Sequence, residues 1–373
     1  MDEWLSCALG ELISLEYGSA LGAEERTGEG YPVFGSNGVV GYHARPLVSG
    51  PGIVVGRKGS AGALVWSDSD FWPIDTTYWV KPKAELELRW VYDALRRCGL
   101  ERLHSSTGVP GLNRDDAYER RVPVPPLEEQ RRIAEILETI DESIQVTARV
   151  IAKLSDLMKG LIADQLLMAD DGCRVSLAEV AEISGGLALS AERAVPDAVE
   201  LPYLRVANVQ DGYIDTTTMR TVRVSRGDVD RYAVHRGDVL MNEGGDFDKL
   251  GRGAVWDGRI DPCLHQNHVF RVRCVPDLLV PEFLALFCQS HEVKSYFVNN
   301  SKQTTNLASI NKTQIGALPT LVPDLARQRR TISAVETLQS RIDAEAEEAS
   351  GLRALRSGLA SDLLSGRMRT VAA

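Results

Sequence analysis

The sequence repeats itself at a fixed offset of 198 residues, and the repeated segments have the residue pattern of helices. Residues 127–144 align without a gap with residues 325–342, and 7 of these 18 positions are identical. The same offset holds further along, where six residues between positions 154 and 166 recur between positions 352 and 364. Solenoid repeats are much shorter, roughly 20 to 50 residues. The sequence therefore predicts an internal duplication, with approximate two-fold symmetry between the two halves of the molecule.

The composition is that of an ordinary folded protein. Of 373 residues, 44% are hydrophobic and 25% are charged, which is enough apolar material for two cores. The first residues, Met1-Asp2-Glu3-Trp4, are acidic and open no signal-peptide pattern, so a cytoplasmic location is expected. The formal net charge of −10 disfavours a nucleic-acid binder that works alone. It is compatible with a binder that has locally basic surfaces or works inside a larger complex.

Turn residues and the repeated segments divide the chain into four parts. Short β-rich runs at residues 52–56, 62–66 and 77–80 are separated by glycine and serine turns, and residues 89–97 have an amphipathic helical pattern. The predicted parts are a β-rich domain at 1–125, a helix at 126–168, a second β-rich domain at 169–323 and a second helix at 324–373. The predicted fold class is thus α+β, with two mixed, mainly β domains alternating with two long helices.

Both predicted long helices carry an apolar seam that requires a partner helix. The first seam is formed by Leu137, Ile140, Ile144, Thr147, Ile151, Leu154, Met158 and Leu161. The second is formed by Val335, Leu338, Ile342, Ala349, Leu352 and Leu359. Glu345 and Arg356 interrupt the second seam, so a less regular second helix is expected. An antiparallel coiled coil of the two helices buries both seams and generates the pseudo-two-fold.

The sequence contains no recognisable catalytic or metal centre. The run Gly56-Arg-Lys-Gly-Ser60 lacks the spacing of a phosphate-binding loop. His265 and His268 have no acidic or thiol partner at ligand spacing, so a metal site is not predicted there. The acidic run from Glu243 to Lys249 is interpreted as an exposed polar loop. No catalytic residue, metal ligand or cofactor site is therefore assigned to this chain.

Three segments together resemble the specificity subunit of type I restriction–modification systems. They are Pro125-Pro-Leu-Glu-Glu-Gln-Arg-Arg-Ile-Ala134, its copy at Gln328-Arg-Arg330, and the terminal Leu355-Arg-Ser-Gly-Leu-Ala-Ser-Asp-Leu-Leu-Ser-Gly-Arg367. The resemblance covers the whole chain, as two target-recognition domains alternating with two helical conserved regions. It departs from the family in its small first recognition domain and its interrupted second seam.

The resemblance implies a division of labour among subunits. Each recognition domain reads one half of a bipartite double-stranded DNA sequence, and the paired helices fix the gap between the halves. The helices also dock two methyltransferase subunits, to which restriction/translocase subunits can add. The chain itself has no catalytic role, so S-adenosylmethionine, ATP and Mg are expected only on the partner subunits. The alternatives are a coiled-coil adaptor without DNA readout and a single-chain modification enzyme, and the absence of methyltransferase motifs opposes the second.

Polar and basic residues in predicted loops are the candidate contacts. The DNA-binding candidates are Ser36, Asn37, Arg57, Lys58, Ser60 and Thr107 in the first body, and Asn208, Gln210, Asn242, Asp246, Lys249, Arg252, Gln303 and Thr304 in the second. Asn and Gln can pair with adenine, and Arg and Lys with guanine. The alternative for each residue is an ordinary turn or surface position. Gln130, Arg131, Arg132, Gln328, Arg329 and Arg330 are the candidate partner-binding residues, with phosphate contact as the alternative.

Overall fold

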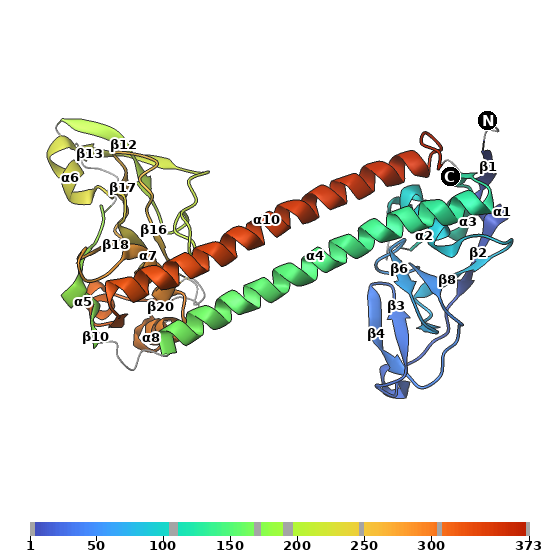
Figure 1. Ribbon diagram of the computed structural model, residues 1–373, viewed down its shortest axis with the longest axis horizontal. Coiled ribbons are helices and arrows are strands. Elements are labelled where there is room, and N and C mark those ends of the chain that lie inside the picture. The colour runs from blue at the N-terminus through green and yellow to red at the C-terminus, as the bar shows by residue number, and fades with distance from the viewer. Residues whose placement is uncertain are drawn as a thin grey trace. The chain divides into compact units, whose positions relative to one another are not determined.

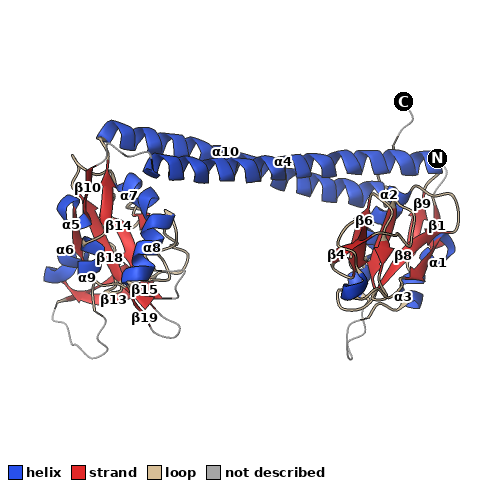
Figure 2. Cartoon of the chain, turned by 90° about the horizontal axis from the view of Figure 1, so that it is seen from below, coloured by secondary structure: helices blue, strands red, loops and turns tan. Residues whose placement is uncertain are grey.

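The computed structural model describes residues 4–103, 111–167, 173–188, 197–245, 250–303 and 308–370, without the side chains of 165–167, 173, 245 and 303. The chain forms two compact units, Met1–Arg149 with Glu345–Ala373 and Val150–Ala344. Each unit contains a β-rich body and part of both long helices (Figure 1). We call the β-rich parts body 1, residues 4–124, and body 2, residues 173–322. In Figure 2 strands form the interior of each body and short helices flank them. No helix in the described part of the chain is long and apolar enough to cross a membrane.

Body 1 is built from short strands with small helices between them. Its elements are β1 (Leu5–Ala8), α1 (Leu9–Leu12), β2 (Ile13–Tyr17), η1 (Ala23–Glu25), β3 (Tyr31–Gly35), β4 (Gly38–His43), β5 (Gly52–Gly56), β6 (Leu64–Ser67), β7 (Trp72–Pro73), β8 (Thr77–Pro82), α2 (Leu88–Cys98), η2 (Leu100–Arg102), α3 (Arg114–Tyr118) and β9 (Arg121–Val124). The strands form a four-stranded sheet β2-β8-β5-β6, a three-stranded sheet β4-β3-β7 and a pair β1-β9.

The core of body 1 lies between the four-stranded sheet and helix α2. Strand β5 is fully buried, and Trp90 and Leu95 of α2 pack with Ile53 of that strand in one apolar cluster. Glu87 caps the start of α2, and Gly99 ends the helix in the left-handed conformation at φ 64°. A residue without Cβ adopts that conformation at little cost, which explains why the helix stops there.

Body 2 repeats this plan with additional elements in its middle. Its elements are β10 (Cys173–Ser176), α5 (Leu177–Val180), β11 (Ala181–Ser184), β12 (Ala198–Leu204), β13 (Arg220–Ser225), η3 (Arg226–Asp228), α6 (Val229–Tyr232), β14 (Val239–Asn242), β15 (Gly244–Gly245), β16 (Gly253–Val255), β17 (Leu264–His265), β18 (Val269–Cys274), α7 (Pro281–Cys288), α8 (His291–Asn300), β19 (Lys302–Gln303), β20 (Ala308–Ser309), α9 (Lys312–Gly316) and β21 (Pro319–Val322).

The sheets of the two bodies correspond strand by strand. The four-stranded sheet β11-β18-β14-β16 of body 2 matches β2-β8-β5-β6, and the pair β10-β21 matches β1-β9. The three-stranded sheets β13-β12-β17 and β4-β3-β7 each contain one parallel pairing, between β12 and β17 and between β3 and β7. The predicted duplication therefore extends into bodies whose sequences have diverged.

Two unbroken helices carry the repeated sequence, α4 (Leu127–Leu167) and α10 (Leu325–Leu363). All eight predicted seam residues of α4 are buried or half-buried. In the first unit, Glu129 contacts Arg369 and Asp141 contacts Arg356, so the start of α4 runs antiparallel to the end of α10. The predicted long helices and their antiparallel pairing are confirmed.

The two charged residues of the second seam, Glu345 and Arg356, both lie within the continuous helix α10. Glu345 is only 6% exposed, and α10 continues without a break through both positions. The Arg356 guanidinium lies 2.5 Å from the Asp93 carboxylate of α2 and 2.8 Å from the Asp141 carboxylate of α4. Because its charge is paired, this largely buried arginine is accommodated in the seam.

Candidate nucleic-acid interface

Three of the predicted DNA-binding residues of body 1 meet at one backbone carbonyl. The Ser36 hydroxyl donates to the Thr76 carbonyl oxygen at 2.6 Å. The backbone amides of Arg57 and Lys58 donate to the same oxygen at 2.9 and 3.1 Å. Two loops, after β3 and after β5, are thereby joined beside the start of β8. The structure thus brings Ser36, Arg57 and Lys58 together.

Two further predicted residues of body 1 lie in these loops. Asn37 is exposed in the turn between β3 and β4, and Ser60 is exposed in the turn between β5 and β6. Thr107 lies outside the described residues.

A tyrosine and a second arginine, neither of them predicted, extend this surface. The Arg57 and Arg114 guanidinium carbons lie 4.9 and 4.6 Å from the centre of the Tyr17 ring, which is half exposed. No described carboxylate forms an ion pair with either arginine. Stacking restricts both guanidinium groups at low entropic cost while leaving donors available. The sequence around Tyr17, the last residue of β2, contains no local pattern that predicts this stacking.

In body 2 the structure gives two predicted DNA-binding residues a structural role. Asn208 and Asn242 are each 1% exposed. The Asn208 side-chain oxygen accepts from the Arg205 backbone amide at 3.0 Å, and its side-chain nitrogen donates to the Asp215 backbone carbonyl at 2.8 Å. Asn242 ends the buried strand β14 and donates to the Val209 carbonyl at 3.0 Å. Both amides hold loops from inside, so neither reaches the surface of the chain.

The other predicted residues of body 2 are only partly described. The Arg252 guanidinium donates to the Gln210 side-chain oxygen at 3.1 Å, and both residues are half-buried. Gln303 is described by its backbone alone, in β19. Asp246, Lys249 and Thr304 lie outside the described residues.

An acid–imidazole pair, also not predicted as a contact, lies directly after Asn242 at the end of β14. The His268 Nδ1 atom lies 2.5 Å from the Glu243 Oε2 atom, and the His268 side chain is 55% exposed. His265, three residues earlier, is fully buried and its Nδ1 contacts the Val269 carbonyl at 2.7 Å. Burial lowers the pKa of His265 to about 4, so this imidazole is neutral. The two histidines therefore have separate partners.

The predicted partner-binding glutamines, Gln130 and Gln328, are buried and form hydrogen bonds within their own units. The Gln130 side-chain oxygen accepts from the Glu87 amide at 3.0 Å, and its nitrogen donates to the Pro125 carbonyl at 2.9 Å. Gln328 repeats this geometry by accepting from the Val280 amide at 2.8 Å and donating to the Pro323 carbonyl at 2.7 Å. Both side chains are at most 2% exposed. Neither amide is therefore accessible to a partner.

The accepting groups of these glutamines explain their repetition. Glu87 is the N-cap of α2 and Val280 is the N-cap of α7, so each glutamine ties a long helix to the start of a short one. Of the four predicted arginines, Arg131, Arg329 and Arg330 are exposed. Arg132 is half-buried and donates to the Thr370 hydroxyl at 3.3 Å.

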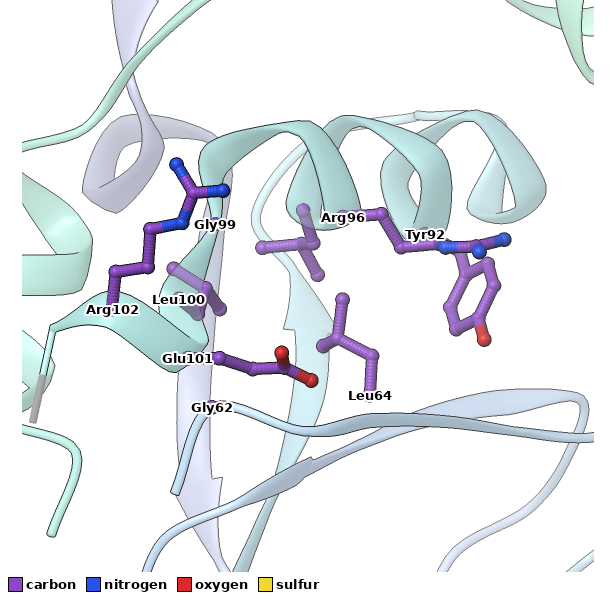
Figure 3. Close-up of a pocket in the computed structure, with 9 residues that line it drawn as sticks. Gly62, Leu64, Tyr92, Arg96, Gly99, Leu100, Glu101 and Arg102 are labelled. Carbon is purple, nitrogen blue, oxygen red and sulfur yellow. The ribbon is translucent and has the colours of Figure 1, made fainter. Parts of the chain in front are cut away.

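A cavity of about 430 Å³ lies beside the C-terminal end of α2 in body 1. Tyr92 and Arg96 reach it from α2, Leu64 from β6, and Glu101 and Arg102 from the turn that follows the helix (Figure 3). Among its described lining residues there is one carboxylate and no histidine, cysteine or serine. These residues supply no paired nucleophile and base. The cavity also contains none of the predicted DNA-binding residues.

Comparison with known proteins identifies relatives along the chain. The putative type I restriction enzyme MjaX specificity subunit of Methanocaldococcus jannaschii is 25% identical over 135 residues, covering 36% of this chain and 32% of that protein. The type I restriction enzyme EcoKI specificity subunit of Escherichia coli K12 is 23% identical over 270 residues, covering 66% of this chain and 57% of that protein. The chain thus spans less than two thirds of the length of either relative.

Solved structures share the fold over nearly the whole chain. The type I restriction–modification S subunit from M. genitalium matches with a TM-score of 0.62 and 19% identity, covering 97% of this chain and 96% of that one. The HsdS subunit from Thermoanaerobacter tengcongensis matches with a TM-score of 0.50 and 16% identity, covering 98% and 97%. The family model described as "Type I restriction modification DNA specificity domain" matches residues 1–156 and 173–353. This chain, with its two corresponding bodies and paired helices, therefore belongs to the type I restriction modification DNA specificity domain family.

Proposed function

We propose that this protein is the DNA sequence-specificity subunit of a type I restriction–modification complex. Each body reads one half of a bipartite double-stranded DNA target. The observation that carries the proposal is the family match across both bodies of a duplicated fold. A coiled-coil adaptor without DNA readout does not require two bodies with corresponding loop surfaces, so the DNA-reading function is preferred.

The partners in this proposal are two methyltransferase subunits and, in the full complex, restriction/translocase subunits. The chain is non-catalytic and cytoplasmic, and S-adenosylmethionine, ATP and Mg are bound by the partner subunits. Two exposed leucines support a pair of equivalent docking surfaces. Leu157 of α4 and Leu355 of α10 stand at matching positions of the repeat and are 54% and 51% exposed. An exposed apolar side chain that recurs at the matching position of the second helix can form the apolar centre of a protein interface.

The partners also account for the acidic charge of the chain. Neutralising backbone phosphates provides much of the affinity for DNA, whereas contacts to base edges provide specificity. In a complex, basic residues of the methyltransferase subunits can neutralise the phosphates. This chain then contributes mainly the contacts to base edges, through polar loop side chains.

The test is methylation of genomic DNA by the chain together with its methyltransferase subunit. The expected motif is bipartite, with two specified halves and an unspecified gap. Replacing residues 1–125 with the corresponding domain of a relative should change one half and leave the other intact. If both halves changed together, the assignment of one half to each body would be wrong. The purified chain with S-adenosylmethionine and DNA should transfer no methyl group, and transfer would contradict the non-catalytic assignment.

A further inference from the structure

One loop position has the same backbone environment in both bodies. In body 1 the Arg57 amide donates to the Thr76 carbonyl at 2.9 Å, and the Arg57 carbonyl accepts from the Leu112 amide at 2.9 Å. In body 2 the Glu243 amide donates to the His268 carbonyl at 3.0 Å, and the Glu243 carbonyl accepts from the Ile310 amide at 2.8 Å. Each residue directly follows the buried central strand of its sheet, β5 or β14.

The correspondence extends to the neighbouring residues. Leu112 and Ile310 are separated by the 198-residue offset of the repeat, and each precedes an asparagine that caps a short helix, α3 or α9. In register, Gly56 pairs with Thr77 and Asn242 with Val269, which places Arg57 and Glu243 one residue beyond matching strand pairs. Arg57 and Glu243 therefore occupy one structural position of the duplicated fold.

The side chains at this position have opposite charges. The Arg57 guanidinium is held by the Asp75 carbonyl at 2.8 Å and by the Tyr17 ring. Its Nε and Nη2 atoms have no hydrogen-bond acceptor among the described residues. The Glu243 side chain is 29% exposed and is held by His268 through Oε2. Both groups are thus oriented by neighbours of their own body while part of each remains available to a ligand.

The inversion of charge distinguishes between two kinds of DNA contact. Every backbone phosphate is negative, so a position that contacts phosphate in both halves of a target requires a positive or neutral donor in both bodies. Base edges differ, since guanine presents two acceptors in the major groove and cytosine presents an amino donor. A position that is arginine in one body and glutamate in the other suits base edges.

We propose that Arg57 and Glu243 are the same specificity-determining position of the two bodies, with Arg57 selecting guanine and Glu243 selecting the amino group of cytosine. This inference rests on the proposed DNA-reading function. Two guanidinium donors match guanine O6 and N7, and a carboxylate oxygen accepts from cytosine N4. Tyr17 and His268 are positioning residues, because each holds the reading group without itself being required to touch a base.

The test compares methylated motifs of complexes that contain the wild-type chain, Arg57→Gln or Glu243→Gln. Arg57→Gln should lower discrimination at one guanine of one half by about ten- to a hundredfold, and Glu243→Gln should do so at one cytosine of the other half. For each variant, the half of the motif read by the other body should stay unchanged. Glutamine in place of Glu243 keeps the size and the acceptor oxygen facing His268, so folding should be preserved. Arg57→Met keeps the unbranched stem of the side chain, removes every donor, and serves as a second variant if Arg57→Gln fails to fold.

Arg89→Gln is the matched control. The Arg89 guanidinium also stacks on an aromatic ring of body 1, 3.7 Å from the centre of Trp66, but it is paired with Asp68 at 2.9 Å and Glu138 at 3.1 Å. Its replacement should leave the motif unchanged.

Two results would overturn the proposal. One is an unchanged motif in both Arg57→Gln and Glu243→Gln complexes. The other is a uniform loss of affinity at Arg57→Gln with a shallower salt dependence and the same motif, which identifies a phosphate contact. Failure of the proposed function itself is distinguishable, because then the wild-type complex already shows no bipartite motif.

Discussion

At the scale of single residues, the buried glutamines Gln130 and Gln328 show how one side chain can hold two elements in place. Each amide satisfies the free backbone amide at the start of a short helix and a carbonyl near the start of a long one. Helix termini leave such groups without intrahelical partners, and burial makes an unpaired group costly. Repetition of the Gln-Arg-Arg triplet therefore reflects a structural joint at its first residue.

Replacing either glutamine with methionine should destabilise its own unit. Gln130→Met and Gln328→Met keep the approximate volume but leave a buried amide and a buried carbonyl unpaired. The expected loss is about 2 to 4 kcal/mol in the free energy of unfolding measured with denaturant. Arg131→Met is the matched control next to Gln130, and because Arg131 is exposed its effect should stay within about 0.5 kcal/mol. A loss of that small size at Gln130→Met would show that the joint contributes little.

Residue type alone was an uneven guide to the candidate surface. An asparagine in a predicted loop can be a turn residue or can contact adenine. Asn208 and Asn242 are instead buried, and their side chains form hydrogen bonds to the backbone of neighbouring loops. Ser36, Arg57 and Lys58 do come together, but the carbonyl that joins them belongs to Thr76, 18 residues from the nearest of them in the sequence. Long-range pairing of this kind leaves no local pattern. The Tyr17 stack and the Glu243–His268 pair escaped prediction for the same reason.

At the scale of elements, the join between α4, α10 and α2 depends on a buried charge cluster. Arg356 is 11% exposed and Asp93 is 7% exposed, so both are largely desolvated. Burial raises the pKa of the Asp93 carboxyl even though Arg356 opposes this shift. A charge in a coiled-coil seam fixes register, because a sliding helix would leave it unpaired.

Arg356→Met should destabilise the first unit in a pH-dependent manner. Without the guanidinium, the pKa of Asp93 rises further in the folded state, so folding takes up a proton above the ordinary aspartate pKa of about 3.9. The loss relative to wild type should therefore grow as pH rises, to about 3 to 5 kcal/mol at neutral pH, and shrink in acid. Unfolding curves at several pH values measure it. Arg353→Met, an exposed arginine one turn earlier, is the control, and a pH-independent loss for Arg356→Met would contradict the expected protonation of Asp93.

The segment after α10 forms a second contact, with the start of α4. The Arg369 guanidinium donates to both oxygens of Glu129 at 2.8 Å, and the Trp4 indole donates to the same carboxylate at 3.3 Å. Hydrogen bonds from Arg369 hold the pKa of Glu129 below its usual range, with the Arg369 charge, the Thr370 amide and Trp4 contributing. Glu129 is 5% exposed, so solvent screens this contact weakly.

Acid should release this segment. Because the folded-state pKa of Glu129 is lowered, the contact stabilises fully above the ordinary glutamate pKa of about 4.3 and is lost as pH falls through the lower folded value. Proteolysis of this segment should therefore be slow at neutral pH and faster in acid, when the rate at each pH is compared with that of an unstructured peptide of the same sequence under the same protease. Glu129→Gln should show fast cleavage already at neutral pH. Equal cleavage of the two proteins at neutral pH would mean that the ion pair does not hold the segment.

Long helices were the most predictable elements, and the reason is physical. A seam of buried residues every three or four positions is a local pattern, so α4 and its need for a partner helix could be predicted from the sequence. The antiparallel direction was predicted from the approximate two-fold symmetry of the repeat. The pairing of Arg356 could not be predicted, because its partner Asp93 lies in a different element, 263 residues away in the sequence. The strand order within each body is likewise set by contacts between distant segments. Contacts between distant segments produce no periodic pattern in the sequence from which they could be predicted.

At the scale of the whole molecule, the duplication predicts two equivalent partner contacts. Leu157→Ser and Leu355→Ser should each reduce the number of bound methyltransferase subunits from two to one, and the double variant should bind none. Val146→Ser is the matched control, because Val146 is 49% exposed on α4 but has Ala344 at the matching position of α10. Native mass spectrometry of the assembled complex counts the subunits. Full occupancy in the double variant would place the docking surfaces elsewhere.

The length of the paired helices is expected to set the gap between the two halves of the target. The boundary between the compact units falls inside both helices, after Arg149 in α4 and after Ala344 in α10. Four residues added to each helix, between Ile144 and Ile151 and at the matching place in α10, lengthen the pair by about 6 Å. That is close to two base-pair steps of about 3.4 Å.

The expected result is an active complex that reads the same two half-sites across a longer gap, as methylation mapping would reveal. Four added residues form a stutter, which paired helices absorb by local unwinding. The same insertion in α4 alone is the control. This insertion shifts the seam of α4 relative to the seam of α10. Either Asp141 is separated from Arg356, or that pair is kept and the apolar residues on the other side of the insertion no longer match, so weaker activity is expected. An unchanged gap with full activity in the doubly extended protein would mean that these helices do not set the spacing, and that the bodies are positioned on DNA by the partner subunits instead.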